Sequence, residues 1–314
     1  MSRIVGYRSI RALSMIAVLA ASVLPVTRYS AFAQNGKATG AGAPSWLRPP
    51  LAALHPQGVR GAGDRAMGLL PTPLADASPP RHAAITSGLP ESVDLSAANP
   101  PVADQGEVSS TASWAIGYYL RGWYALAQRR YPSGSGRLPA GFAPMYLYSQ
   151  ASGGQDIGST LESNLNLLAS QGIDSRADYR PQGDFTWTLP PSKRQRFRAA
   201  PYRIASYGAS YDSSLPLTDW IKTSIAQGTP VVVALPVFDS FYYADSTHFY
   251  VDSPPRGARP LGRVALFADK YDAHGLWVEN QWGTWWGLNG WVELSWRYIQ
   301  SQGLEAVNII PRAT

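Results

Sequence analysis

The order of the secondary-structure signals predicts that this 314-residue chain adopts an α+β fold. Apolar side chains recur at helical spacing after Ser110, from about Ser159 to Ser170, and from Leu217 to Ala226. Runs rich in β-branched and aromatic residues, with turn residues between them, follow from Val231 to Leu294. Helices first and an antiparallel sheet afterwards are typical of an α+β protein with two subdomains.

The three predicted helices carry start and stop signals. Ser109 or Ser110 can cap the first helix by accepting from its free backbone N–H groups. Gly172 and Gly228 follow the second and third helices, where glycine favours the left-handed conformation that ends a helix. The stretch 187–198 contains prolines and basic residues and is predicted to be a solvated loop. The predicted strands are the runs 231–235, 249–251, 264–267, 276–278 and 291–294.

Residues 1–33 have the features of a secretory signal peptide. A basic start precedes an apolar core, Ala12 to Val26, and small residues surround a cleavage site after Ala33. The apolar run is too short, and too soon followed by Arg28, to form a stable membrane span. We therefore expect an exported protein, secreted or periplasmic, without a membrane span after cleavage. The alternative is a retained amphipathic anchor.

Composition excludes several classes of function. The formal net charge is +6, and the signal segment carries four arginines and no acid, so +6 − 4 leaves +2 for the rest. Nucleic-acid binding is therefore not indicated. The chain has no cysteine, which excludes disulfides, a cysteine nucleophile and a thiolate metal site. No pair of its four histidines has the spacing of metal ligands on a helix, so neither a metal nor a cofactor is expected.

Residues 34–88 are predicted to be a linker or pro-segment. They are rich in alanine, glycine and proline, a composition that rarely builds a core of its own. Two short apolar patches within them, Ser45 to Leu47 and Met67 to Leu70, are candidates for local docking. A single domain over 89–314 is predicted to follow.

Three segments of this domain have the form of a dispersed catalytic motif. The first, Asp104 to Ala115, reads D-Q-G-E-V-S-S-T-A-S-W-A. The second, Gly262 to Asp272, reads G-R-V-A-L-F-A-D-K-Y-D, and the third, Asn280 to Trp291, reads N-Q-W-G-T-W-W-G-L-N-G-W. Three shorter fragments accompany them, at 89–95, 142–148 and 152–154.

These segments, in this order, resemble the papain-like cysteine proteases. The first is similar to the family's D-Q-G-x-x-G-S-C-x-S-W-A, and the third to N-S-W-G-x-x-W-G-x-x-G-Y. The resemblance covers roughly residues 89–310. It implies a papain-like two-subdomain fold, with a helical left subdomain, an antiparallel β-barrel-like right subdomain and a cleft between them.

The resemblance also implies a role for each matched position. Thr111 stands at the position of the nucleophilic cysteine, Arg263 at that of the histidine, Gln105 at that of the oxyanion donor and Asn280 at that of the asparagine that orients the histidine. The implied cleft-binding residues are Gly153, Gly154, Arg263 and Trp282.

Two of these replacements remove the family's chemistry. A cysteine protease needs a thiolate and a nearby imidazole that keeps it ionised. The Thr111 alcohol needs a stronger base than a thiol does, and the guanidinium of Arg263 stays protonated and cannot act as one. Because N-terminal threonine hydrolases use their own free amine as base, an internal threonine does not fit that mechanism either.

We therefore predict an exported papain-like pseudoprotease that acts as a binding or scaffold protein through its degenerate cleft. The expected partner is a peptide, a protein or an acidic ligand, since Arg263, a helix N-terminus and the Gln105 amide together favour an anion. Pairing of Arg263 with Asp269 or Glu107 is the competing interpretation. Two further alternatives stay open: an active hydrolase with Thr111 as nucleophile, and a carbohydrate-associated accessory protein that uses surface tryptophans such as Trp285.

Overall fold

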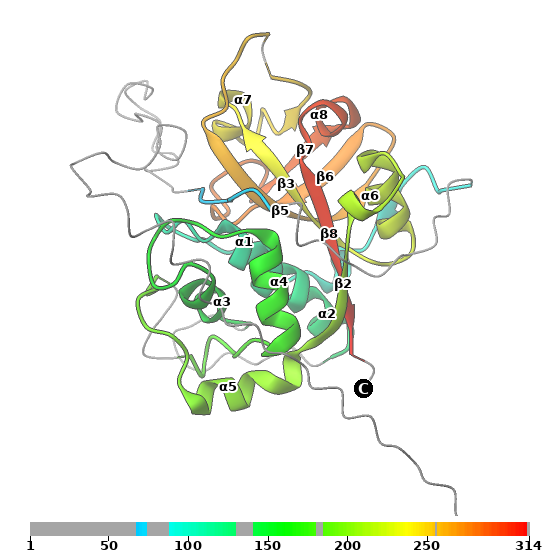
Figure 1. Ribbon diagram of the computed structural model, residues 1–314. Helices are drawn as coiled ribbons and strands as arrows, with labels where there is room; N and C mark the ends of the chain where they lie inside the picture. The colour runs from blue at the N-terminus through cyan, green and yellow to red at the C-terminus, as the bar shows by residue number, and fades with distance from the viewer. Residues whose placement is uncertain (1–66, 74–87, 130–140, 180–184, 255, 313–314) are drawn as a thin grey trace, which may run out of the picture. The chain divides into compact units, whose positions relative to one another are not determined.

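The computed structural model describes residues 67–73, 88–129, 141–179, 185–254 and 256–312, which form a group of helices and one large sheet (Figure 1). The predicted signal peptide and most of the predicted linker lie outside the described residues. Among the described residues, no helix combines the length and the apolar character that a bilayer crossing requires.

A long buried helix at the start of the domain positions the first motif. It begins with α1 (Thr111–Ser113), continues through a π-helical stretch (Trp114–Leu120) and ends with α2 (Arg121–Ala127). Every residue of the π-helical stretch is buried. The packing of this apolar run against other elements stabilises the helix. The helix predicted to begin after Ser110 is confirmed.

Three further helices follow it in the chain, and the first two of them pack against it. They are α3 (Pro144–Ala151), α4 (Leu161–Ser170) and α5 (Lys193–Ala199). A proline occupies the first turn of α3, where its missing N–H costs nothing. The Thr160 hydroxyl caps α4 by accepting from the backbone N–H of Ser163 at 3.0 Å.

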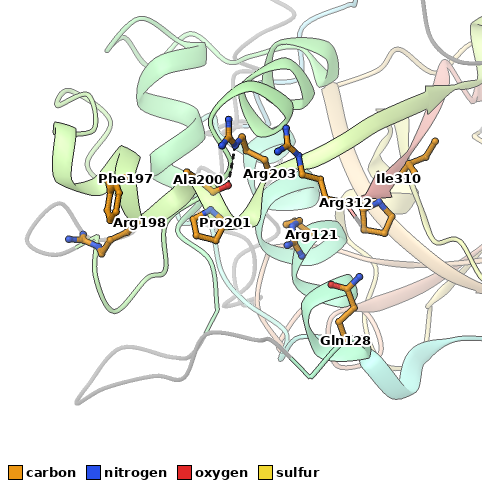
Figure 2. Close-up of a pocket in the computed structure, with 10 residues that line it drawn as sticks. Arg121, Gln128, Phe197, Arg198, Ala200, Pro201, Arg203, Ile310 and Arg312 are labelled. Carbon is orange, nitrogen blue, oxygen red and sulfur yellow. Dashed lines mark hydrogen bonds between the residues drawn. The ribbon is translucent and has the colours of Figure 1, made fainter. Parts of the chain in front are cut away.

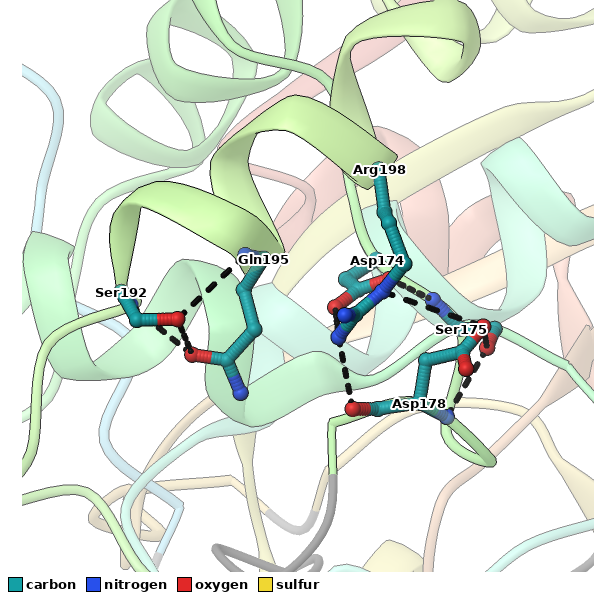
Figure 3. Close-up of polar contacts among 6 residues, drawn as sticks. All are labelled: Asp174, Ser175, Asp178, Ser192, Gln195 and Arg198. Carbon is teal, nitrogen blue, oxygen red and sulfur yellow. Dashed lines mark hydrogen bonds and ion pairs between the residues drawn. The ribbon is translucent and has the colours of Figure 1, made fainter.

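The expectation of a solvated loop at 187–198 is wrong for its second half, because α5 begins at Lys193. Ser192 and Gln195 form a capping box (Figure 3): the Ser192 hydroxyl accepts from the Gln195 N–H at 3.3 Å, and the Gln195 side chain accepts from the Ser192 N–H at 2.8 Å. Basic residues in the last turn, Arg196 and Arg198, favour the same helix through its dipole.

The strands form one eight-stranded sheet in the order β2-β8-β3-β5-β6-β7-β4, with β1 paired to β5 outside this path. All pairs are antiparallel except β4 with β7. The strands are β1 (Val93–Asp94), β2 (Ile204–Ala209), β3 (Val231–Val237), β4 (Tyr250–Val251), β5 (Gly262–Tyr271), β6 (Gly275–Glu279), β7 (Trp291–Ser295) and β8 (Glu305–Pro311). The predicted barrel-like subdomain is therefore wrong, because β2 and β4 end the strand order of an open sheet.

Alternation along the central strands divides the sheet between two cores. On β5, Ala265 and Phe267 pack in the core that contains the helices α1 to α4, whereas Val264, Leu266 and Ala268 pack in a second core. The second core is closed by α6 (Leu217–Ala226), α7 (Asp239–Tyr242) and α8 (Trp296–Gln302), which lie against the strands in Figure 1. Before the bulge between Ala268 and Lys270, the odd-numbered residues of β5 thus face the helices, and Arg263 is one of them.

Candidate functional site

The Thr111 side chain is fully engaged in hydrogen bonds inside the protein. Its hydroxyl donates to the carbonyl oxygen of Ala265 at 3.1 Å and accepts from the Ala265 N–H at 3.0 Å. It also accepts from the Gln281 side-chain amide at 2.6 Å. A hydroxyl has one donor and two acceptor sites, so all three are used. With 0% of the residue exposed, the nucleophile position holds a saturated structural hydroxyl.

Arg263 lies on β5, two residues before Ala265 and on the same face of the strand. Its side chain is partly buried and, within the described residues, makes no hydrogen bond and no ion pair within 4 Å. Neither Asp269 nor Glu107 is its partner. Arg263 acts electrostatically on Glu305. Burial raises the pKa of the Glu305 carboxyl, and the positive charge of Arg263 opposes this rise.

Gln105 is completely buried, and its side-chain amide donates to the Val108 carbonyl oxygen at 2.8 Å. The amide to which the family resemblance assigns the role of oxyanion donor thus makes a hydrogen bond within its own loop, to a residue three positions later. That loop is held by a second short contact, in which the Asp104 carboxylate accepts from the Gly106 N–H at 2.7 Å. Gly106 has a φ of 61°, which explains the glycine at this turn.

Asn280 is also buried, and its side chain has no imidazole beside it. Its Oδ1 accepts from the backbone N–H of Gln281 at 2.9 Å, and within the described residues its Nδ2 has no hydrogen-bond partner. One half of the amide therefore makes a structural hydrogen bond. Asn280 consequently fixes the start of the segment that carries Gln281.

Trp282 is a core residue, and its assignment as a cleft-binding residue is not supported by its position. Its exposed fraction is zero, and its ring packs edge-on against Tyr242 and Trp286 at centroid distances of 5.4 Å. Such packing contributes burial energy to the second core and leaves no ring face for a ligand.

The Gly153–Gly154 pair lies at the end of α3. Both residues have positive φ, 63° and 78°, so glycine is required there by the backbone. A side chain at Gly154 would point toward Thr188, and one at Gly153 would meet open space. The glycine that lies against an extended segment is Gly158, four residues later.

Residues 67–72 form that extended segment, which lies between the helical part and the sheet and is here named the cleft segment. Leu69 bridges Ser159 in parallel register: the Leu70 N–H donates to the Ser159 carbonyl at 3.1 Å, and the Ser159 N–H to the Gly68 carbonyl at 3.0 Å. On the other side, the Leu69 N–H donates to the Arg263 carbonyl at 3.4 Å. The predicted local docking of Met67 to Leu70 is thus confirmed.

Side chains fix the cleft segment at both ends. Met67 and Leu69 are buried, with Met67 in the second core and Leu69 in the helical core. The Thr72 hydroxyl donates to the Glu305 carboxyl at 2.9 Å. The cleft segment therefore covers the strand that carries Arg263 and the loop before Thr111, where Gly68 contacts Ser109 so closely that a Cβ on Gly68 would collide with its carbonyl.

The histidines do not supply a base at this site. His248 is 81% exposed and lies in a turn, where its Nδ1 is 3.2 Å from an Asp245 carboxylate oxygen. His274 lies in the turn between β5 and β6. His55 and His82 are outside the described residues. Within the described residues no group of three acidic or histidine side chains can hold a metal ion.

Sequence reasoning missed four participants in this site: Gln281, Gly158, Glu305 and the path of the cleft segment. Gln281 follows the matched asparagine directly, and its amide was the available signal, because a buried amide must find a partner. The contacts of Glu305 and Gly158 join parts of the chain far apart in sequence and leave no local pattern.

Comparisons with known proteins agree with this geometry. No protein-family model matches the sequence. The chain is 24% identical over 218 residues to an uncharacterized peptidase C1-like protein, L477, of Acanthamoeba polyphaga mimivirus, which covers 64% of this chain and 66% of that protein. The chain thus spans just under two thirds of the length of this relative.

Solved cysteine proteases share the fold. Xylellain, a cysteine protease from Xylella fastidiosa, superposes with a TM-score of 0.62 at 18% identity, covering 79% of this chain and 96% of xylellain. A procathepsin B from Trypanosoma congolense gives 0.58 at 18% identity, covering 79% and 87% of the two chains. A digestive procathepsin L 3 of Tenebrio molitor gives 0.53 at 19% identity, covering 73% of each.

The chain therefore has the papain-like fold, with an open sheet in place of a barrel. In sequence the chain is similar to the peptidase C1-like protein, and in fold it is similar to solved cysteine proteases. At these sequence identities the solved structures show a shared fold only. The function depends on the residues of the site itself.

Proposed function

We propose that this protein is a catalytically inactive papain-like protein whose cleft binds an extended polypeptide. The observation that carries the first half is the saturated Thr111 hydroxyl. To attack a carbonyl, this oxygen would have to give up its bonds to Ala265 and Gln281 and gain a base. Arg263, at the histidine position, has no proton-accepting atom.

The second half rests on how the cleft holds its own chain. The cleft segment is bound through backbone hydrogen bonds to Ser159 on one side and Arg263 on the other, with Leu69 buried between them. Addition of an extended strand through main-chain contacts, with a pocket for an apolar side chain, is a common mode of peptide recognition. A partner peptide of that kind would occupy the path that residues 67–72 take here.

The proposed ligand is thus an extended peptide with a buried leucine-type side chain, and an anion in the cleft is not part of the proposal. Glu305 is buried, bonded to Thr72 and within electrostatic reach of Arg263, so the protein places an acidic group of its own on this side of Arg263. Export to the periplasm or beyond remains a prediction from the pattern of residues 1–33.

Two glycine substitutions distinguish removal of the cleft segment from damage to the wall that binds it. Gly68→Ala places a Cβ against the Ser109 carbonyl at a φ of 72°, so it should release the cleft segment. Gly158→Ala places a Cβ against the Gly68 carbonyl, so it should obstruct the wall for any peptide on that path. A fluorescent peptide with the sequence of residues 67–72 is the probe, and polarisation is the readout.

The wild-type chain should bind this probe weakly, because its own segment competes at an effective concentration in the millimolar range. Gly68→Ala should bind it at least about tenfold more tightly, and the double variant Gly68→Ala/Gly158→Ala should lose that gain. Circular dichroism and thermal melting report whether each variant is folded. Absence of binding to folded Gly68→Ala, or equal binding by the single and double variants, would refute the peptide-binding cleft.

In the alternative of an active hydrolase, Thr111 would be the nucleophile. A cleavage assay that compares Gly68→Ala with Gly68→Ala/Thr111→Ala tests this alternative. The carbohydrate alternative rests on Trp285, which is 41% exposed. A single exposed ring is common on protein surfaces, and a glycan array would test this alternative directly.

A further inference from the structure

An open pocket of about 1400 Å³ lies where the C-terminal part of the long helix that begins at Thr111 meets the edge of the sheet, and neither Thr111 nor Arg263 lines it (Figure 2). Its walls come from α2, from the end of α5 and the turn after it, and from the last residues of β8. Four arginines line it: Arg121, Arg198, Arg203 and Arg312. No aspartate or glutamate belongs to its lining.

Backbone carbonyls hold three of these arginines through their Nε atoms. Arg121 Nε donates to the Tyr202 carbonyl at 3.0 Å, Arg203 Nε to the Ala200 carbonyl at 3.1 Å, and Arg312 Nε to the Ile204 carbonyl at 3.4 Å. An Nε bond fixes the direction of a guanidinium and keeps its outer edge available. Within the described residues, the terminal nitrogens of Arg203 and Arg312 make no hydrogen bond, and neither arginine has an ion pair.

The fourth arginine, Arg198, forms an ion pair with a buried aspartate of the protein. Arg198 Nη2 lies 2.8 Å from the Asp174 carboxylate and also donates to the Asp178 carbonyl at 2.8 Å (Figure 3). Asp174 is almost completely buried, so Arg198 is compensated from behind. The uncompensated charge therefore sits on Arg203 and Arg312 at the rim.

An exposed aromatic ring lines the same pocket, next to Arg198 (Figure 2). Phe197 is 82% exposed and lines the pocket together with Pro201 and Pro311. A large apolar side chain with so much exposure, in the same pocket as arginines with free edges, combines two side-chain types that are enriched at protein interfaces. The volume exceeds the 300–1000 Å³ that is roughly typical of small-molecule sites, which favours a polypeptide as occupant.

We propose that this pocket, here named the arginine pocket, binds an acidic segment of a partner protein that also carries apolar side chains. Carboxylates of that segment would accept paired hydrogen bonds from the free edges of Arg203 and Arg312, the geometry to which guanidinium is suited. An apolar side chain of the segment would cover Phe197. The arginine pocket shares no residue with the cleft, so this proposal stands or falls independently of the proposed function.

The test uses the full chain and a short fluorescent peptide of alternating glutamates and leucines, measured by polarisation at about 150 mM salt, where non-specific attraction is screened. A matched peptide has glutamine at every glutamate position. The wild-type chain should bind the acidic peptide and bind the glutamine peptide at least about tenfold more weakly, as expected when charged hydrogen bonds are lost.

Two double variants with the same change in charge identify the site. Arg203→Gln/Arg312→Gln should weaken binding of the acidic peptide about tenfold or more. Lys193→Gln/Arg194→Gln, on the exposed side of α5 and outside the pocket lining, should change it by no more than about twofold. Phe197→Ser should weaken binding several-fold without removing charge, and thermal melting confirms that each variant is folded.

Equal losses in the two double variants would show general charge attraction and overturn the proposal. So would equal binding of the two peptides. Binding of inorganic phosphate or dextran sulfate in place of the peptide, abolished by Arg203→Gln/Arg312→Gln, would also overturn it, because it would assign the arginines to a non-protein anion.

Discussion

The Gln281 side-chain amide donates to the Thr111 hydroxyl at 2.6 Å, and this hydrogen bond joins two motif segments that are 170 residues apart in the chain. The same amide also donates to the Ala265 carbonyl at 3.2 Å. Thr111 and Gln281 thus tie the start of α1 to β5 and to the segment after β6. The residue at the nucleophile position has become a structural junction between the helices and the sheet.

Thr111→Val should destabilise the fold, since it removes the hydroxyl and keeps the shape. The Ala265 N–H would be left buried without its acceptor, which costs about 1–3 kcal/mol in free energy of unfolding. Urea denaturation measures the change, and Thr218→Val on α6 is the control, because Thr218 is not fully buried. A Thr111→Val variant as stable as wild type would contradict the structural role.

Thr111→Cys alone should not produce peptidase activity. A thiol at this position still has Arg263 where a base is needed, and the cleft segment still covers the site. Turnover is first expected in the triple variant Gly68→Ala/Thr111→Cys/Arg263→His, measured with fluorogenic peptides. Turnover by the single cysteine variant would mean that another group acts as base.

Asp269 should make the protein less stable as the pH rises from about 4 to about 7. Burial first, and then the negative charge of Asp94, raise the pKa of Asp269 from 3.8 to about 7, while Asn99 and Lys270 act in the opposite direction. The neighbouring Glu279 has its pKa raised well above the usual value by burial and by the charge of Asp269. In this pH window the folded state therefore holds protons that the unfolded chain releases, and its stability falls as pH rises.

Asp269→Asn should remove that part of the pH dependence, because the amide stays neutral. Relative to wild type, this variant should gain on the order of 2–4 kcal/mol more free energy of unfolding at pH 7 than at pH 4. Denaturation curves at several pH values measure it, with the exposed Asp219→Asn as control. Parallel pH profiles for wild type and Asp269→Asn would count against this interpretation.

Ser192→Ala should cost about 1 kcal/mol by removing one half of the capping box of α5. The loss should be local, so hydrogen exchange should accelerate in Lys193–Ala199 and little elsewhere. Uniform acceleration over the whole domain, or none in α5, would show that the cap does not hold this helix.

Local patterns predicted the parts of this fold that depend on local physics. The helix at Leu217–Ala226 and the strands around Val231 and Trp291 were predictable because their apolar periodicity is strong. Strand β8 was missed, because it carries Glu305 and Asn308 on a buried strand. Both are accommodated by partners far away in sequence, Thr72 and Ser224, so no local rule identifies them.

The candidate site divides in the same way. The positions of Thr111, Gln105, Arg263 and Asn280 were available from motif spacing. Their present partners were not, because each is a contact between segments that only the fold brings together. The wrong expectation for Trp282 has this origin too: a motif position says where a residue lies along the chain and not whether the core has enclosed it.

The most direct test of the central claim is a search for cleavage by the protein with its cleft uncovered. Gly68→Ala and Gly68→Ala/Thr111→Ala, at equal concentration, would be incubated with a diverse peptide library, and new termini would be quantified by mass spectrometry. A degenerate binding cleft predicts the same background pattern for both variants. Cleavage by Gly68→Ala that disappears when Thr111 becomes alanine would contradict it and make this protein a threonine-dependent hydrolase.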